Sequence, residues 1–363
     1  MAICKRPAAA VAMGGQAVKK RRVKEPAVIK KAAVIKKPAA YATTADYEEE
    51  KTCLGEGAFG VVFKARHRAT GQTVAIKHLS SPPPEVASDA PDPSEQLLRE
   101  ARFLEACNGD PNIVGFHCVV RDPDTTELGL VMEYIAGQSL RDILEDQRNG
   151  TAPPFPEATV RAFMRQLLTG AKGMQERSIV HRDIKPANVL VAEGAEVLKI
   201  CDFGLAISTS DPTPHGEVGT VLYTAPELLL GKPDADSLAD TWSLGCIMAE
   251  LVDGEILLLR AQRLCDEGLA YLWTIFWLLG TPDDVMWPGF ASLPRAAEMP
   301  PLKPGQRSRL RELYPEWTLS DEGFEVMSGL LTCNPEKRLT AAEALKLPWF
   351  AEDDEDYMTR SYC

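Results

Sequence analysis

From about residue 47 to 135, hydrophobic and polar residues recur at the short spacing that is typical of strands. VVFKARHR (61–68) and TVAIKHL (73–79) are rich in β-branched residues, and the Ala-Thr-Gly between them predicts a hairpin. The stretch SSPPPEVASDAPDP (80–93) is rich in proline and predicts a loop. In SEQLLREARFLEAC (94–107) the apolar residues recur at helical spacing. This part of the chain is therefore expected to be mostly β, with one helix.

From about residue 136 onward the pattern changes to helices. ATVRAFMRQLLTGAKGMQ (158–175) and SLADTWSLGCIMAELV (237–252) predict amphipathic or buried helices. YLWTIFWLL (271–279) is far shorter than the ~20 residues that a membrane helix needs, so we interpret it as a core helix. The last helix-forming stretch ends near LPWF (347–350). The whole pattern predicts an α+β protein with a small β-rich part and a larger, mainly helical part.

Composition adds the broad class of protein. The 363 residues are 45% hydrophobic and 25% charged, which is typical of globular proteins that fold in water. The length fits two units or one bilobed domain. The nine cysteines are odd in number and scattered, with no CxxC pair and no secretory leader. We expect reduced thiols in the cytosol or nucleus, and no membrane association.

The net charge of −12 hides a strong asymmetry. Residues 1–38 contain eleven Lys and Arg and one acidic residue, a net +10, so the remainder of the chain carries −22. AVIKK occurs at 27–31 and again at 33–37, and no aromatic residue precedes Tyr41. We therefore predict that residues 1 to about 45 are a disordered basic arm. Residues 351–363, which include EDDED, are expected to form a solvated acidic tail.

Two basic clusters stand out within the arm. Lys5-Arg6 and Lys19-Lys20-Arg21-Arg22 flank a twelve-residue spacer, which resembles a bipartite nuclear import signal read by a carrier protein. This resemblance implies a nuclear protein that also passes through the cytoplasm. A nucleic-acid-binding arm is an alternative, and it would show salt-sensitive binding that is lost when residues 1–38 are deleted. A tail that only adds solubility is the other alternative.

A glycine-rich segment is the first candidate for binding a ligand. Residues 55–62 read GEGAFGVV, and glycines at 55, 57 and 60 let main-chain amides approach phosphate oxygens. About twenty residues later, VAIK ends in Lys77 on a predicted strand. A buried lysine that faces nucleotide phosphates needs a carboxylate to hold it, and Glu100 on the predicted helix is the candidate.

HRDIKPAN (181–188) supplies the remaining polar groups. Asp183 is the type of residue that accepts a hydrogen bond from an attacking hydroxyl, and Lys185 can neutralise charge on a moving phosphoryl group. Asn188 and Asp202, in CDFG, offer the oxygen ligands that Mg²⁺ prefers. The cluster therefore predicts transfer of a phosphoryl group to a hydroxyl, with Mg²⁺ as the metal.

Residues 47–350 resemble a eukaryotic protein kinase of the serine/threonine branch. The resemblance adds APE (225–227), DTWSLG (240–245) and Arg338 in NPEKRLT to the motifs above, in family order. It implies a bilobed kinase domain over 46–350, with an N-lobe over 46–135 and a C-lobe over 136–350. It further implies that Glu227 pairs with Arg338 and that Asp240 supports the catalytic loop.

The same resemblance implies an ATP site, in which adenine hydrogen-bonds to the main chain near Met132. The implied nucleotide-contacting residues, besides Lys77, are Leu54, Gly55, Glu56, Gly57, Gly60, Val62, Ala75, Met132, Glu133, Ile135 and Leu190. Protein hydroxyls are the implied phosphoryl acceptors. A binding scaffold without catalysis is the alternative, but the residues needed for catalysis are all present.

Among protein kinases the chain most resembles the cyclin-dependent kinases, including plant-type members. PSEQLLRE (93–100) is similar to their cyclin-binding helix, and PNIV (111–114), WSLGCIMAEL (242–251) and LLGTPDDVMWPGF (278–290) are similar to further family segments. This resemblance implies a cyclin-like regulatory subunit that moves the helix carrying Glu100 inward. An ordinary amphipathic helix that needs no partner is the alternative.

The segment EVGTVLYTAPE (217–227) departs from that family. Gly219 and Thr224 stand where the family has the valine and arginine that shape a pocket for a proline after the target residue. Strict proline-directed specificity is therefore not expected to follow from the resemblance.

The residue that the family phosphorylates for activation also differs. Alignment back from APE puts His215 at that position, and Thr213 lies two residues earlier. A phosphate on Thr213 could meet Arg182 and order the loop. The alternatives are phosphorylation of residues 208–210, or a fixed charge from Glu217.

Overall fold

The structure is a computed structural model, and it describes residues 41–57, 60–79, 92–194, 197–210, 219–232, 236–264, 271–283, 285–299 and 305–351. Contacts divide the chain into two units, 1–39 and 40–363, and only the second contains described residues. The predicted import signal and the acidic tail beyond Ala351 therefore lie outside the described residues.

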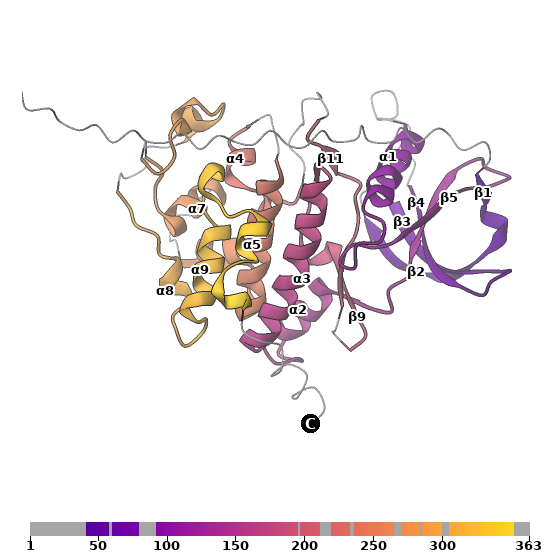
Figure 1. Cartoon of the computed structure of the whole chain (residues 1–363), viewed down its shortest axis with the longest axis horizontal. Coiled ribbons are helices and arrows are strands. Elements are labelled where there is room, and N and C mark those ends of the chain that lie inside the picture. Colours follow the sequence, from indigo (N-terminus) through magenta and orange to yellow (C-terminus); the bar gives the residue numbers. More distant parts are fainter. Residues whose placement is uncertain are drawn as a thin grey trace, which may run out of the picture. The chain divides into compact units, whose positions relative to one another are not determined.

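A curled six-stranded sheet forms the small lobe. The strands lie in the order β1-β5-β6-β4-β3-β2. Their bounds are β1 Ala42–Thr43, β2 Tyr47–Gly57, β3 Gly60–His67, β4 Thr73–His78, β5 Phe116–Arg121 and β6 Leu128–Glu133. The predicted hairpin over 61–79 is confirmed, because β3 and β4 pair in antiparallel register from Val61↔His78 to Arg66↔Thr73. Figure 1 shows this sheet at one end of the unit formed by residues 40–363, beside helix α1.

Helix α1 (Pro93–Ala106) is the one α-helix among the described residues of the small lobe. Asp92 caps it by accepting a hydrogen bond from the Ser94 amide at 2.8 Å. Leu97, Glu100, Ala101 and Leu104 are buried, at the spacing of one helical face. The predicted loop over 80–93 is wrong at its last residue, because Pro93 is the first residue of the helix, a position that proline favours.

The larger lobe contains the remaining helices and two small sheets. The short strands pair in the orders β10-β9-β7 and β11-β8. Their bounds are β7 Gly137–Ser139, β8 Ile179–Val180, β9 Val189–Ala192, β10 Leu198–Ile200 and β11 Ile207–Ser208. The helices are α2 Leu140–Arg148, α3 Glu157–Glu176, α4 Pro226–Leu229, α5 Ser237–Asp253, α6 Leu257–Leu264, α7 Tyr271–Leu279, α8 Leu310–Leu313, α9 Asp321–Leu330 and α10 Ala341–Ala344. The short 3₁₀ turns are η1 Thr44–Asp46, η2 Pro186–Asn188, η3 Val221–Tyr223, η4 Phe290–Ser292, η5 Ala296–Glu298, η6 Pro335–Lys337 and η7 Pro348–Phe350.

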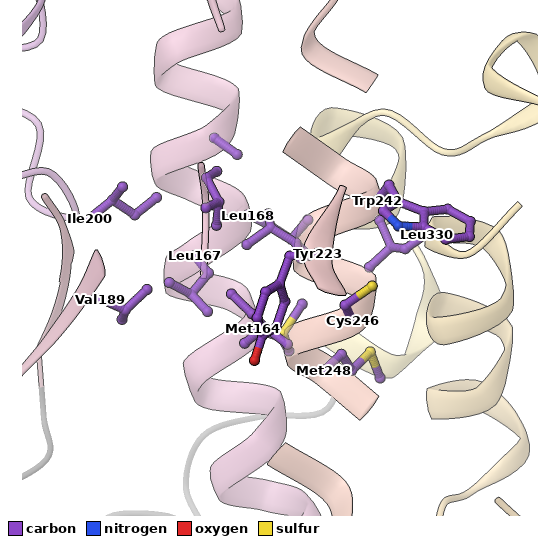
Figure 2. Packing of buried hydrophobic residues seen from close by; sticks show 14 of the residues in the cluster. Met164, Leu167, Leu168, Val189, Ile200, Tyr223, Trp242, Cys246, Met248 and Leu330 are labelled. Atoms are coloured by element: carbon purple, nitrogen blue, oxygen red, sulfur yellow. The ribbon is translucent and has the colours of Figure 1, made fainter. Parts of the chain in front are cut away.

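The core of the larger lobe is built around α3 and α5. Nearly every residue of α5 is buried, which fits its lack of a polar face. Figure 2 shows α3 residues between the β9–β10 strands on one side and α5 and α9 on the other. The labelled contacts involve Met164, Leu167, Leu168, Val189, Ile200, Tyr223, Trp242, Cys246, Met248 and Leu330. The core is continuous with the loops that carry the polar motifs, so it fixes their positions.

The predicted α+β, bilobed fold is confirmed. The core-helix prediction for 271–279 is also confirmed, because α7 buries Thr274, Ile275, Phe276 and Leu278. None of the helices in the described part of the chain combines the length and apolar character needed to cross a membrane. One boundary was wrong: disorder was predicted to about residue 45, but residues 42–46 form β1 and η1.

Candidate active site

Lys77 brings together groups from distant parts of the chain. It lies on β4, opposite Val62 on β3 and Leu130 on β6. Its ammonium Nζ is 2.9 Å from each carboxylate oxygen of Glu100 on α1 and 2.6 Å from Oδ1 of Asp202. The side chains of Lys77 and Glu100 are 6% and 2% exposed, and that of Asp202 is 31% exposed. The buried cation therefore has two carboxylate partners, one of which reaches solvent.

Electrostatics keep this group charged. Burial opposes a charge on Lys77, but the carboxylates of Glu100 and Asp202 outweigh it and raise the pKa of Lys77 above its ordinary value. Burial also disfavours ionised Asp202, yet the Lys77 ammonium lowers the pKa of Asp202 below its ordinary value. Both groups are therefore ionised near neutral pH. A fixed ammonium beside a partly open carboxylate can receive phosphate oxygens and a cation.

Asp183, Lys185 and Asn188 lie in the loop between β8 and β9. Lys185 Nζ is 2.8 Å from Oδ2 of Asp183. The Asn188 amide nitrogen donates to the main-chain oxygen of Asp183 at 2.8 Å and to its Oδ2 at 3.1 Å. The Thr220 hydroxyl donates to Oδ1 of Asp183 at 2.9 Å and accepts from Lys185 Nζ at 2.8 Å. The Asp183 carboxylate is thus held in one orientation, as a group that receives a hydrogen bond from a reacting hydroxyl must be.

A buried carboxylate holds the backbone of this loop. Asp240 on α5 accepts from the His181 amide at 2.8 Å and from the Arg182 amide at 2.9 Å. The His181 ring lies 3.0 Å from the main-chain oxygen of Cys201, next to Asp202. Arg182 and Asp202 both have positive φ, at 67° and 65°, which is uncommon for residues other than glycine. The surrounding bonds maintain these strained conformations, which typically occur at functional sites.

The residues implied to contact a nucleotide come from the small-lobe sheet, from the residue after β6 and from β9 of the larger lobe. Leu54, Gly55, Glu56 and Gly57 lie on β2, Gly60 and Val62 on β3, Ala75 on β4, Met132 and Glu133 on β6, Ile135 after β6, and Leu190 on β9. Ala75 pairs with Met132 across the sheet. Oε2 of Glu133 accepts from the Gly115 amide at 2.9 Å and lies 3.1 Å from Lys199 Nζ. Its side chain is therefore occupied, and its main-chain amide donates to the main-chain oxygen of Gly115 at 2.8 Å.

Comparison with known proteins identifies the family. The sequence profile of the protein kinase domain matches residues 47–350. The chain belongs to the protein kinase family. Since the domain and the relatives agree, the kinase is a serine/threonine kinase of the cyclin-dependent type, and the family to which it belongs uses ATP.

Several named relatives support this placement. The kinase is 45% identical over 307 residues to a rice (Oryza sativa subsp. japonica) protein named cyclin-dependent kinase F-2, covering 83% of this chain and 89% of the relative. It is 38% identical to cell division control protein 2 homolog 3 of Trypanosoma brucei brucei, over 82% and 90% of the two chains. It is 37% identical to cyclin-dependent kinase G1 of Arabidopsis thaliana over 82% of this chain. That match covers 48% of the Arabidopsis protein, so the kinase spans about half the length of this relative.

Two guanidinium groups bond to the main chain of the segment after Asp202. Arg182 Nε donates to the main-chain oxygen of Leu205 at 2.8 Å, and Arg99 on α1 donates to that of Ala206 at 2.9 Å. Burial and the nearby positive charge of Arg99 lower the pKa of Arg182 to about 10, so it stays charged near neutral pH. Thr213 lies outside the described residues, with the rest of 211–218.

Gly219 and Thr224 are the two residues that differ from the family in the segment 217–227. Gly219 has φ of 100°, and a Cβ there would lie 2.6 Å from the main-chain oxygen of Arg182. A side chain at this position therefore meets both backbone strain and a steric clash. Thr224 donates from its hydroxyl to the main-chain oxygen of Thr220 at 3.1 Å. The threonine thus stabilises the turn that carries the Asp183 contact.

The implied pair of Glu227 and Arg338 lies at the base of this segment. Nη1 and Nη2 of Arg338 each donate to one carboxylate oxygen of Glu227 at 2.7 Å. Arg338 also donates to the main-chain oxygens of Thr332, Leu238 and Cys333. The side chains of the pair are 0% and 3% exposed, so the contact is a fully buried ion pair.

Sequence reasoning missed two polar residues of the site. Thr220 bridges Asp183 and Lys185, and Arg99 reaches the segment after Asp202. Thr220 lies 37 positions after Asp183, and hydroxyl residues are common in loops, so no local signal identified it. Arg99 directly precedes Glu100 on α1. Because neighbouring residues of a helix point in different directions, Glu100 reaches Lys77 whereas Arg99 reaches Ala206.

Proposed function

We propose that the kinase transfers the γ-phosphoryl group of MgATP to serine or threonine hydroxyls of proteins. The observation that carries this proposal is the fixed Asp183 carboxylate, held by Lys185, Asn188 and Thr220. Asp183 would accept a hydrogen bond from the attacking hydroxyl, and Lys185 would offset charge on the moving group. Lys77, kept in place by Glu100, would bind the nucleotide phosphates.

The oxygen donors of the site fit Mg²⁺. Asn188 uses its amide nitrogen toward Asp183, which leaves its side-chain carbonyl oxygen as the atom able to bind a cation. Asp202 supplies a carboxylate that Lys77 keeps ionised. No cluster of three or more His, Cys, Asp or Glu suited to a metal occurs in the described ranges, so phosphates and waters would complete the ligand set, as Mg²⁺ prefers. Asn188 and Asp202 would hold the Mg²⁺, which would supply positive charge against the phosphates.

We further propose that a cyclin-like subunit controls the kinase through α1. The helix carries both Glu100, which contacts Lys77, and Arg99, which contacts the segment after Asp202. A partner that shifts α1 would therefore change both contacts at once. The names of the relatives from rice and Arabidopsis support this assignment.

We also propose that substrates need no proline after the target residue. Gly219 has a positive φ and no Cβ, where the family has a valine. Thr224 bonds to the nearby main-chain oxygen of Thr220, where the family has the longer side chain of an arginine. Both changes favour a more general binding surface beside Thr220.

The experiment for these proposals is phosphorylation of an arrayed serine/threonine peptide library by the full chain with MgATP. It is run with and without a panel of cyclins, and Asp183→Asn serves as the inactive control. We expect activity that rises on addition of a cyclin and selects no proline after the target. Strict selection of proline would contradict the specificity proposal alone. Activity that no cyclin changes would contradict the cyclin proposal, and inactivity under every condition would contradict the catalytic one.

We propose that the basic arm directs the kinase to the nucleus by binding an import carrier. The two-cluster spacing supports this over a general charge effect. The test compares two fluorescent fusions that each lose four positive charges. One carries alanines at Lys19, Lys20, Arg21 and Arg22, and the other carries alanines at Lys30, Lys31, Lys36 and Lys37.

We expect the first fusion to leave the nucleus and the second to remain there. Equal loss of nuclear signal from both would indicate that charge alone matters, and retention of both would reject the import signal. Salt-sensitive binding of nucleic acid by the wild-type arm, with unchanged localisation, would favour the nucleic-acid alternative.

A further inference from the structure

The residues just before the family-matched region form an ordered extension of the sheet. The kinase profile begins at residue 47, yet β1 (Ala42–Thr43) pairs in parallel with β5 through Ala42↔Val120 and Thr43↔Arg121. Without β1, strand β5 would be an open edge of the sheet. The extension therefore covers an edge that the family-matched residues leave unpaired within the described sheet.

This extension also connects the two edges of the sheet. In the strand order β1 lies at one end and β2 at the other, yet only η1 separates them along the chain. Four peptide units from Thr43 to Tyr47 span at most about 14 Å. The two edges must therefore approach each other here, and residues 41–47 close the curled sheet. Figure 1 shows β1 beside β5, with β2 returning beneath them.

Two aromatic residues hold β5 from opposite faces. The Tyr41 ring lies 4.8 Å from the guanidinium carbon of Arg121 and packs against the large core cluster. The Tyr47 hydroxyl lies 3.7 Å from Sγ of Cys118, and Tyr47 packs against the separate cluster that contains Val120. Because side chains alternate along a strand, Cys118 and Arg121 point to opposite faces. We call residues 41–47 the clamp.

Polar contacts fix the clamp at both edges. On the β5 side, the Thr44 hydroxyl donates to Oδ2 of Asp122 at 3.1 Å. On the β3 side, the Arg68 amide donates to the main-chain oxygen of Asp46 at 2.8 Å, and its Nε donates to that of Ala45 at 3.2 Å. The clamp is thus bonded to strands on either side of the closure.

Strand β5 is one of the supports of α1. The core cluster joins Leu97 and Leu104 of α1 to Leu130 of β6, and Phe116 and Val119 of β5 pack against it. Val119 lies on the same face of β5 as Arg121, the residue on which Tyr41 stacks. A change in the clamp therefore reaches the surface against which α1 packs.

We propose that the clamp is a positioning element for the reaction: by closing the sheet it holds β5, and through β5 it holds α1 where Glu100 bonds to Lys77. No hydrogen bond, ion pair or ring contact described for residues 41–47 involves a nucleotide-contacting residue or the Asp183 loop. Strand β5 also pairs with Met132 of β6 through Phe116. In this proposal the effect of the clamp on the reaction passes through Glu100.

The first test is a double-mutant cycle on the full chain. Tyr41→Ala is expected to lower kcat/KM about tenfold, whereas Tyr41→Phe, which keeps the ring, changes it less than about twofold. In a Glu100→Gln background, Tyr41→Ala should add less than about twofold, because the contact through which it acts is already lost. The full tenfold loss in that background would overturn the proposal, since it would show that the clamp acts elsewhere.

The second test needs no activity, so it separates failure of this proposal from failure of the kinase assignment. Deletion of residues 1–40 keeps the clamp, and deletion of 1–46 removes Tyr41 through Asp46. We expect the longer deletion to raise hydrogen exchange in α1 while α5 stays protected, and the shorter one to match the full chain. Unchanged exchange in α1, or equal loss of protection in α1 and α5, would reject the positioning role.

Discussion

Asp202→Asn is expected to lower phosphoryl transfer by roughly a thousandfold or more while the chain stays folded. The substitution keeps the size of the side chain and removes its charge. Asp202 is the partly exposed carboxylate beside Lys77, and it would supply the charged oxygen ligand for Mg²⁺. Loss of one preorganised electrostatic group at a reacting centre commonly costs about 10²–10³ in rate, and loss of a metal ligand removes more.

The measurement is the initial rate of peptide phosphorylation with saturating MgATP, together with thermal unfolding of each variant. Asp124→Asn is the matched control, because it makes the same chemical change at an exposed turn between β5 and β6. The control should keep wild-type activity. If Asp202→Asn retained more than about a tenth of the activity, the metal role assigned to Asp202 would be rejected. If it unfolded, the rate would have to be measured at lower temperature before any conclusion.

The predictable part of this site is the part encoded by local spacing and charge. Lys77 ends a predicted strand that follows the glycine-rich segment, and a lysine buried there needs a carboxylate, so the sequence pointed to Glu100 on the next helix. The structure places their side chains 2.9 Å apart. Asp183, Lys185 and Asn188 could be grouped because eight residues of one loop contain them. In each case the residues that must contact each other belong to one loop or to elements that follow each other along the chain.

Contacts between distant segments could not be predicted in this way. Lys77 and Asp202 are 125 positions apart, and the second partner of the lysine emerges only when α1, β4 and the segment after β10 meet. Thr220 closes a bond network 37 positions from Asp183. Hydroxyl residues are common in loops, so nothing in the local pattern distinguished this one.

The start of the ordered domain shows the same limit. A two-residue strand has no hydrophobic periodicity to detect, and residues 42 and 43 are Ala and Thr. Their order comes from parallel pairing with β5, nearly eighty positions later, and from Tyr41 stacking on Arg121. The composition of the basic arm predicted disorder to about residue 45, and tertiary contacts override that prediction at its end.

Breaking the ion pair between Glu227 and Arg338 is expected to cause the largest loss of stability. Arg338→Met should lower the free energy of unfolding by about 3–5 kcal/mol, because it leaves a buried carboxylate without its partner. The carboxylate side chain is 3% exposed, so water cannot replace the guanidinium. The main-chain oxygens of Thr332, Leu238 and Cys333 lose a donor as well. For a domain of about 300 residues, this loss corresponds to a fall in Tm of about 5–8 °C.

The double variant Glu227→Gln/Arg338→Met separates the two causes. Neutralising Glu227 removes the unpaired charge but leaves the three carbonyl oxygens without a donor. We therefore expect the double variant to recover part of the loss, so that its cost is smaller than the sum of the two single variants. A cost equal to that sum would show that the two side chains do not stabilise each other, and that Arg338 acts only through the carbonyl oxygens.

Arg141→Met is the control for loss of an arginine. Arg141 lies 3.7 Å from Glu145 on the surface of α2, and the two side chains are 58% and 52% exposed. An exposed helical pair of this kind contributes about half a kcal/mol or less, so the Tm of Arg141→Met should stay within about 1 °C of wild type.

Glu227 lies four residues after Tyr223, whose segment carries Thr220 to Asp183. Below its unfolding temperature, Arg338→Met should therefore also show a lower kcat, because the base of that segment is no longer fixed.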